Sequence, residues 1–182
     1  MATVQTQRLL LHRLSRADAP FMLALLNDAD FIRHIGDKGA RSLDDAVRYI
    51  EDGPLASYSR FGFGLYRVDR RDTGLPIGIC GLIKRETLVD VDVGFAFLPA
   101  HRAHGYALES VRAVLDHARD HCGLSRLVAI VSPDNLRSIR LLERAGFDFE
   151  RAIAWPPANE TLHLMATDVE PTPLRRATDR RG

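Results

Sequence analysis

A short basic turn, Arg102-Ala-His-Gly-Tyr-Ala107, separates an apolar segment from a segment with the periodicity of an amphipathic helix. The helical periodicity is carried by Leu108, Val111, Leu115, Ala118 and Cys122. The first amides of a helix have no partner within the helix, and the helix dipole is positive at that end. The turn offers small residues at Ala103, Gly105 and Ala107 and basic residues at Arg102 and His104. It is therefore a candidate phosphate site that suits a pyrophosphate best, the alternative being an ordinary strand-to-helix joint with a structural glycine.

The elements around this turn are those of one mixed α/β domain. Strands are expected at residues 7–14, 61–68, 76–83, 90–98, 126–131, 147–153 and 162–167. Helices are expected after Ser15, after Ser42, from the basic turn to Gly123, and from a cap at Ser132 or Asp134 to Gly146. We expect the strands at 61–68, 76–83 and 90–98 to form an antiparallel meander, and 126–131 to lie parallel to 90–98. Residues 27–39 are predicted to be a loop, and residues 171–182 a solvated tail.

Composition narrows the class of protein. The chain has 182 residues, of which 46% are hydrophobic, and 25 basic residues balance 24 acidic ones to give a net charge of +1. A net charge this close to zero produces no long-range positive potential that would attract nucleic acid, so we expect no nucleic-acid partner. No apolar run approaches the roughly 20 residues of a membrane span. A signal peptide needs a longer apolar stretch than Leu9–Leu11, which ends at His12 and Arg13. We expect no membrane association and a cytoplasmic protein.

The two cysteines, Cys80 and Cys122, lie in apolar runs without the spacing of metal ligands. We expect two buried free thiols in a reducing compartment and no metal site.

Four blocks of sequence resemble the GCN5-related N-acetyltransferase (GNAT) family. The basic turn matches its Gln/Arg-x-x-Gly-x-Gly/Ala signature, and further blocks resemble the ribosomal-protein N-terminal alanine acetyltransferase branch. The blocks are residues 77–82, 91–99, 105–109 and 133–147, within a match from about Thr6 to Asp168. Ala103 stands where many members have glycine. The resemblance implies an α/β fold with a mostly antiparallel sheet, a splayed parallel strand pair and flanking helices, in a single domain over residues 1–170.

The resemblance also implies that acetyl-CoA binds as co-substrate between the splayed strands. Its pantetheine would pair with the strand edge at Phe95, Ala96 and Phe97. Its pyrophosphate would meet the turn at Arg102, Ala103, His104, Gly105, Tyr106, Ala107 and Leu108. Asn135 and Ser138 correspond to polar residues at the start of the second cofactor-side helix.

Acetyl transfer from a thioester to an amine requires a neutral amine, a stabilised oxyanion and protonation of the departing thiolate. Asn135 and Ser138 share one helical face, and by the family match we assign Ser138 as the proton donor, with a simple helix cap as the alternative. Tyr106 is a second hydroxyl near the turn. Asp92 matches an acidic family position and shares a strand face with Asp90, so this pair is the candidate base, with a solvated polar face as the alternative.

Three further side chains have weaker interpretations. Glu109 lies in the first helical turn, and we interpret it as structural. His163 is a minor candidate for the acceptor cleft. Tyr106 is expected mainly to pack.

The leading hypothesis is an acetyl-CoA-dependent N-acetyltransferase acting as a monomer or homodimer. Its acceptor could be a protein N-terminus or a small amine such as an amino acid, a polyamine or an antibiotic, since residues 27–41 and 155–161 carry no diagnostic motif. A non-catalytic CoA-binding sensor or interaction module is the alternative. A dinucleotide-binding oxidoreductase fits poorly, because its glycine-rich turn would belong to an early βαβ unit.

Overall fold

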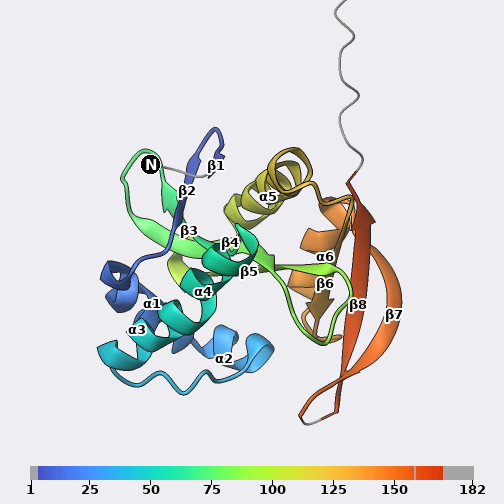
Figure 1. The fold of residues 1–182 in the computed structure, drawn as a ribbon, viewed down its shortest axis with the longest axis horizontal. Coiled ribbons are helices and arrows are strands. Elements are labelled where there is room, and N and C mark those ends of the chain that lie inside the picture. Colours follow the sequence, from blue (N-terminus) through green and yellow to red (C-terminus); the bar gives the residue numbers. More distant parts are fainter. Residues whose placement is uncertain (1–3, 158, 170–182) are drawn as a thin grey trace, which may run out of the picture.

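The computed structural model describes residues 4–157 and 159–169. The predicted tail at residues 171–182 lies outside the described residues. Eight strands form one sheet in the order β1-β2-β3-β4-β5-β6-β8-β7 (Figure 1). The predicted α/β class with a mostly antiparallel sheet is confirmed.

The first five strands are antiparallel throughout. They are β1 (Val4–Gln5), β2 (Leu9–Arg13), β3 (Leu65–Arg70), β4 (Pro76–Ile83) and β5 (Val91–Phe97). The predicted meander is confirmed, and β4 has the predicted bounds. The strand expected at residues 61–68 begins later, because Gly62, with φ of 80°, ends a helix that includes Phe61.

The sheet changes direction at β6 (Arg126–Val131), which has the predicted bounds and pairs parallel to β5. The two remaining strands, β7 (Asp148–Trp155) and β8 (Glu160–Asp168), are antiparallel to each other, and β8 pairs with β6. In Figure 1 this second half of the sheet turns steeply away from β4 and β5.

Helices cover both faces of the sheet. One face is covered by the N-terminal helices α1 (Ala19–Leu26), α2 (Ala29–Ile35) and α3 (Leu43–Ile50), which share a core with Ile79 and Ala96. The opposite face carries α5 (Tyr106–Cys122) and α6 (Leu136–Arg144), which share the larger core with Cys80 and Val93. Short helical turns lie at η1 (Arg16–Asp18), η2 (Glu51–Leu55) and η3 (Pro99–His101), and α4 (Ala56–Phe61) follows η2.

The prediction of a loop over residues 27–39 is wrong in its first half. Asp28 accepts a hydrogen bond from the Phe31 amide at 3.1 Å and so caps α2, which ends at Gly36 with φ of 100°. Phe31 and Ile35 have helical spacing, but interspersed charged residues weakened that pattern in the sequence.

The structure also tests the predictions made for the N-cap of α6, for the two cysteines and for a membrane span. The N-cap of α6 is Asn135 and not Ser132 or Asp134, because the Asn135 side chain accepts from the Ser138 amide. Cys80 is a buried free thiol as expected, whereas the Cys122 thiol is only half-buried. Among the described helices none is both long and apolar enough to cross a membrane.

Candidate active site

A deep cleft opens where β5 and β6 separate. The two strands pair only at Val91 with Leu127 and at Asp92 with Val128. Beyond this point the Ile130 amide donates to Asp92 Oδ1 at 3.3 Å, so a side chain takes the place of a strand partner. The cleft has a volume of about 1630 Å³ and runs between this opening, α2 and the first turns of α5 and α6.

The cleft brings together eleven of the twelve predicted cofactor residues. They are Phe95, Ala96, Phe97, Arg102, Ala103, Gly105, Tyr106, Ala107, Leu108, Asn135 and Ser138. His104 does not line it: its Nδ1 lies 2.6 Å from the Arg102 carbonyl oxygen, and its ring stacks on Tyr106.

The free edge of β5 forms one wall of the cleft. Phe95 and Phe97 pair with β4 on the other side and pack into the core beneath α5, while Ala96 faces the core of the N-terminal helices. In an antiparallel pair, alternate residues direct their N–H and C=O groups away from the partner strand. Since β6 has diverged, these outward groups face the cleft.

The basic turn presents a run of unpaired backbone donors. Gly105 and Ala103 have φ angles of 80° and 63°. No group in residues 4–157 or 159–169 accepts a hydrogen bond from the amides of residues 103–108, and the first bonded amide is that of Glu109, which donates to the Gly105 carbonyl at 3.1 Å. With the positive end of the α5 dipole behind them, these amides suit an anionic ligand.

Arg102 holds this turn in place. Its Nε donates to the Phe97 carbonyl at 2.9 Å, its Nη1 donates to Asp30 at 2.7 Å, and its Nη2 donates to Asp28. The guanidinium therefore ties the turn to β5 and α2, and two carboxylates already balance its charge. Three arginines that the sequence analysis did not select line the cleft from α6: Arg137, Arg140 and Arg144.

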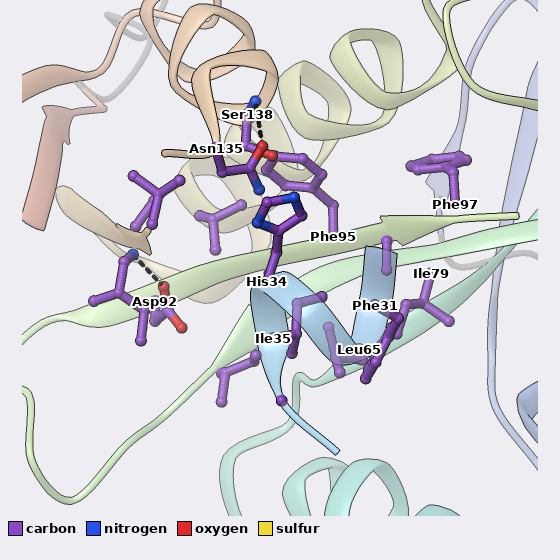
Figure 2. A pocket seen from close by; sticks show the side chains of 18 of the residues that line it. Phe31, His34, Ile35, Leu65, Ile79, Asp92, Phe95, Phe97, Asn135 and Ser138 are labelled. Carbon is purple, nitrogen blue, oxygen red and sulfur yellow. Dashed lines mark hydrogen bonds between the residues drawn. The ribbon is translucent and has the colours of Figure 1, made fainter. Parts of the chain in front are cut away.

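The start of α6 faces the cleft with two polar side chains. The Ser138 amide donates to Asn135 Oδ1 at 3.1 Å, which leaves the Asn135 amide group free to donate (Figure 2). The Ser138 hydroxyl has no hydrogen-bond partner in the described part of the chain, so it is available to a ligand.

Asp92 is the most deeply buried acid of the cleft, with 2% of its surface exposed. Its Oδ2 accepts from Arg85 Nε at 2.6 Å. Burial raises the pKa of Asp92 above its ordinary value, although the charge of Arg85 and the hydrogen bonds oppose that rise. Asp90 does not join it: it lies outside the cleft lining and binds Arg126 at 3.1 Å.

His34 is a cleft residue that the sequence analysis missed as a site. Figure 2 shows its ring directed from α2 toward Asn135 and Ser138, with Phe95 beside it. Its Nδ1 is buried without a hydrogen-bond partner among the described residues, and Asp134 Oδ1 lies 3.9 Å away. The helical spacing within residues 27–39 was the signal that would have placed it on a face.

The weaker candidates have other contacts. Glu109 accepts hydrogen bonds from the Thr6 hydroxyl and from Arg8, as expected for a structural residue. The Tyr106 ring packs beneath the guanidinium of Arg8. His163 lies edge-on to Phe149 at 4.8 Å and does not line the cleft, so its assignment to the acceptor cleft is wrong.

Among residues 4–157 and 159–169, no group of three or more His, Cys, Asp or Glu side chains is arranged to hold a metal ion.

Comparison with known proteins gives consistent matches. The family model described as Acetyltransferase (GNAT) domain matches residues 8–148. The uncharacterized N-acetyltransferase YoaA of Bacillus subtilis (strain 168) is 28% identical over 148 residues, which cover 81% of this chain and 83% of that protein.

Solved structures have the same fold. The acetyltransferase from Agrobacterium tumefaciens str. C58 superposes with a TM-score of 0.77 at 26% identity, covering 92% of this chain and 94% of that one. Spermidine N-acetyltransferase from Vibrio cholerae, in complex with CoA and spermine, has a TM-score of 0.75 at 18% identity, with coverage of 90% and 97%. At that identity the likeness concerns the fold alone.

Proposed function

Because the chain belongs to the GNAT family of acetyltransferases, we propose that it transfers the acetyl group of acetyl-CoA to a primary amine by direct attack in a ternary complex. One observation carries this proposal: the separation of β5 from β6 lies in the same cleft as the unpaired amides of residues 103–108. A strand edge and an anion-binding turn in one cleft suit a ligand with an amide-containing arm and a pyrophosphate.

The residues present fit acetyl-CoA as co-substrate. The amides from Ala103 to Leu108 would hold the pyrophosphate, and the outward backbone groups of Phe95 and the outward amide of Phe97 would pair with the pantetheine arm, while the backbone groups of Ala96 between them are directed toward β4. Arg102 would act by holding the turn, and the arginines of α6 add positive charge along the same wall. His104 contributes at most through its backbone amide.

Within this site Ser138 is the proposed proton donor to the departing thiolate. Its hydroxyl is half-buried, faces the cleft and has no partner among the described residues. The outward amides of β5 would stabilise the charge that develops on the thioester oxygen. Asn135 keeps the first turn of α6 in place and directs an N–H group to the same space.

The amine proton has two candidate acceptors. Asp92 has an elevated pKa, and because it is buried beneath Arg85 it would act through water. His34 faces Asn135 and Ser138 more directly. Asp92 is the proposed acceptor of the amine proton, and Asp90 is the matched carboxylate used to test it.

We expect Asp92→Asn to lower kcat/KM about 100-fold for every amine, because general-base assistance contributes 10²–10⁴-fold. Asp90→Asn removes an acid of the same segment that Arg126 holds outside the cleft, and it should stay near the wild-type rate. Steady-state kinetics on both folded variants measure this. Wild-type rates in Asp92→Asn would reject Asp92, and His34→Gln would then test the remaining acceptor.

Cofactor choice is a second expected result. Acetyl-CoA should raise the thermal unfolding midpoint and NAD should not, because the cleft has a strand edge for an amide arm but lacks an early glycine-rich βαβ unit. Differential scanning fluorimetry with each ligand measures the shift. Stabilisation by NAD alone would contradict the proposal.

A non-catalytic CoA-binding module is the second candidate function, because no feature of the described residues identifies the amine that would accept the acetyl group. It predicts that acetyl-CoA binds but that no amine accelerates the release of CoA. The unpartnered hydroxyl of Ser138 at the cofactor wall favours the enzyme.

A further inference from the structure

The end of the cleft beyond Asp92 contains a guanidinium held in a fixed orientation. Arg85 Nε donates to the buried Asp92, and its guanidinium carbon lies 5.5 Å from the centre of the Trp155 ring. Within the described chain, no group accepts a hydrogen bond from the terminal nitrogens of Arg85. A planar guanidinium fixed through Nε and an aromatic face keeps its remaining donors available for a planar anion.

Lys38 adds a second cation to the cleft. Lys38, from the segment after α2, lines the same cleft, and its Nζ lies 3.4 Å from the Ile35 carbonyl oxygen. Burial lowers the pKa of Lys38, and the nearby charge of Arg85 lowers it further. Two cations that repel each other across a cleft wall would both be stabilised by an anion between them.

The other charged groups at this end of the cleft do not neutralise Arg85 and Lys38. Asp92 is already bound to Arg85 Nε and to the Ile130 amide. Lys84 donates to the carbonyls of Leu88 and Val89. Glu160 on β8 and Asp52 on η2 are exposed, line the cleft and form no ion pair within the described chain, so these two acids could favour a cationic acceptor instead.

We propose that Arg85 and Lys38 bind a carboxylate of the acceptor, so that the preferred substrate is an amine that also carries an acid group. This proposal rests on the proposed acetyltransferase function. Asp92 lies three residues from Phe95 along β5, which corresponds to about 10 Å. If the thioester lies against the outward groups of Phe95, as proposed above, the acid and the amine are separated by several bonds, as in an ω-amino acid or a short acidic peptide, and not adjacent as in an α-amino acid.

Matched acceptors test the proposal. The small acceptors are ε-aminocaproate, its neutral amide and hexamethylenediamine, which share one chain length and differ in the distal group. We expect kcat/KM for the acid to exceed that for the neutral amide by about 10- to 100-fold, the range of a charge-assisted pair of hydrogen bonds, with the diamine lowest. The tripeptide amides alanyl-alanyl-glutamate and alanyl-alanyl-glutamine, compared in the same way, distinguish a peptide source from a small amino acid.

Two variants assign the effect to these residues. Lys38→Gln leaves the contact between Arg85 and Asp92 intact and should reduce the preference for the acid several-fold, while Arg85→Gln should abolish it. Arg151→Gln, on an arginine of β7 that does not line the cleft, should keep the wild-type preference. Equal kcat/KM for acid and amide in the wild type, a preference for the diamine, or an unchanged preference in Lys38→Gln and Arg85→Gln would each overturn the proposal.

A binding measurement separates this proposal from the proposed function. Calorimetry on the protein saturated with CoA should show ε-acetamidocaproate binding at least 10-fold more tightly than its neutral amide, with the difference reduced in Lys38→Gln and lost in Arg85→Gln. If no amine is acetylated but this difference persists, the acetyltransferase proposal fails and the carboxylate site stands. If acetylation occurs but the difference is absent, the carboxylate site fails alone.

Discussion

Replacing Gly105 with valine is expected to lower the affinity for acetyl-CoA about 100-fold while the protein remains folded. Gly105 has φ of 80°, a conformation that a β-branched residue adopts only with strain. A Cβ at this position would also lie 3.3 Å from Arg8 Nη2, so the turn would have to shift and would no longer hold the amides of residues 103–108 in their present geometry. Loss of even two charge-assisted hydrogen bonds, at about 1.5 kcal/mol each, accounts for the expected factor.

A control for this variant is available at the other end of the same helix. Gly123, the C-cap of α5, has φ of 66°, and a Cβ there would meet nothing within 4 Å. Gly123→Val therefore carries a similar backbone strain at a distance from the turn, and it should bind acetyl-CoA normally. Isothermal titration calorimetry on both variants measures the difference. Unchanged affinity in a folded Gly105→Val protein would exclude the turn as the pyrophosphate site.

The second large effect is expected at Ser138. Ser138→Ala should lower turnover by about 10²–10⁴-fold, because a thiolate leaves poorly unless a proton is delivered to it. Acetyl-CoA affinity should change far less, because the turn and the β5 edge are untouched. The helix cap also survives, since Asn135 accepts from the Ser138 backbone amide and not from its hydroxyl.

Ser132→Ala is the matched control for Ser138. Ser132 lines the same cleft, but its hydroxyl already donates to Asp134. Steady-state rates and a direct titration of acetyl-CoA on each variant separate chemistry from binding. If Ser138→Ala binds acetyl-CoA normally and turns over at the wild-type rate, Ser138 is only part of the helix start, and Tyr106 or solvent becomes the leading proton donor.

The sheet and the cofactor wall were predictable because their signals are local. The strands β4 and β6 are apolar runs bounded by polar segments, so their bounds followed directly from the sequence. The turn before α5 combined glycine, small residues and a helical periodicity within one short segment. These patterns predict that the N-terminus of α5 lies beside the end of β5.

The acceptor side was not predictable in the same way, because it is assembled from distant segments. Arg85 follows β4, Trp155 ends β7 and Lys38 follows a helix that the sequence analysis took for a loop. Each is unremarkable among the 25 basic residues or the scattered aromatics of the chain. Their meaning depends on tertiary contacts, above all the bond between Arg85 and the buried Asp92.

Arg102 illustrates the same limit at a residue that the sequence analysis did select. Its position in the turn suggested a ligand for the pyrophosphate. Its partners Asp28 and Asp30 lie far away in the sequence, at the start of α2. Through its bonds to them and to the Phe97 carbonyl, the guanidinium links the turn to α2 and β5. Spacing alone identified the position but not the direction of the side chain.

One assay tests most directly whether this cleft transfers an acetyl group. The wild-type protein is incubated with acetyl-CoA and a panel of amines and N-terminal peptides. Free thiol is followed by absorbance, and each acceptor is examined by mass spectrometry. We predict CoA release that depends on at least one amine, with an equal amount of that amine gaining one acetyl group. Saturating acetyl-CoA binding with no acetylated amine above the uncatalysed rate would contradict acetyl transfer by this cleft and identify a CoA-binding module instead.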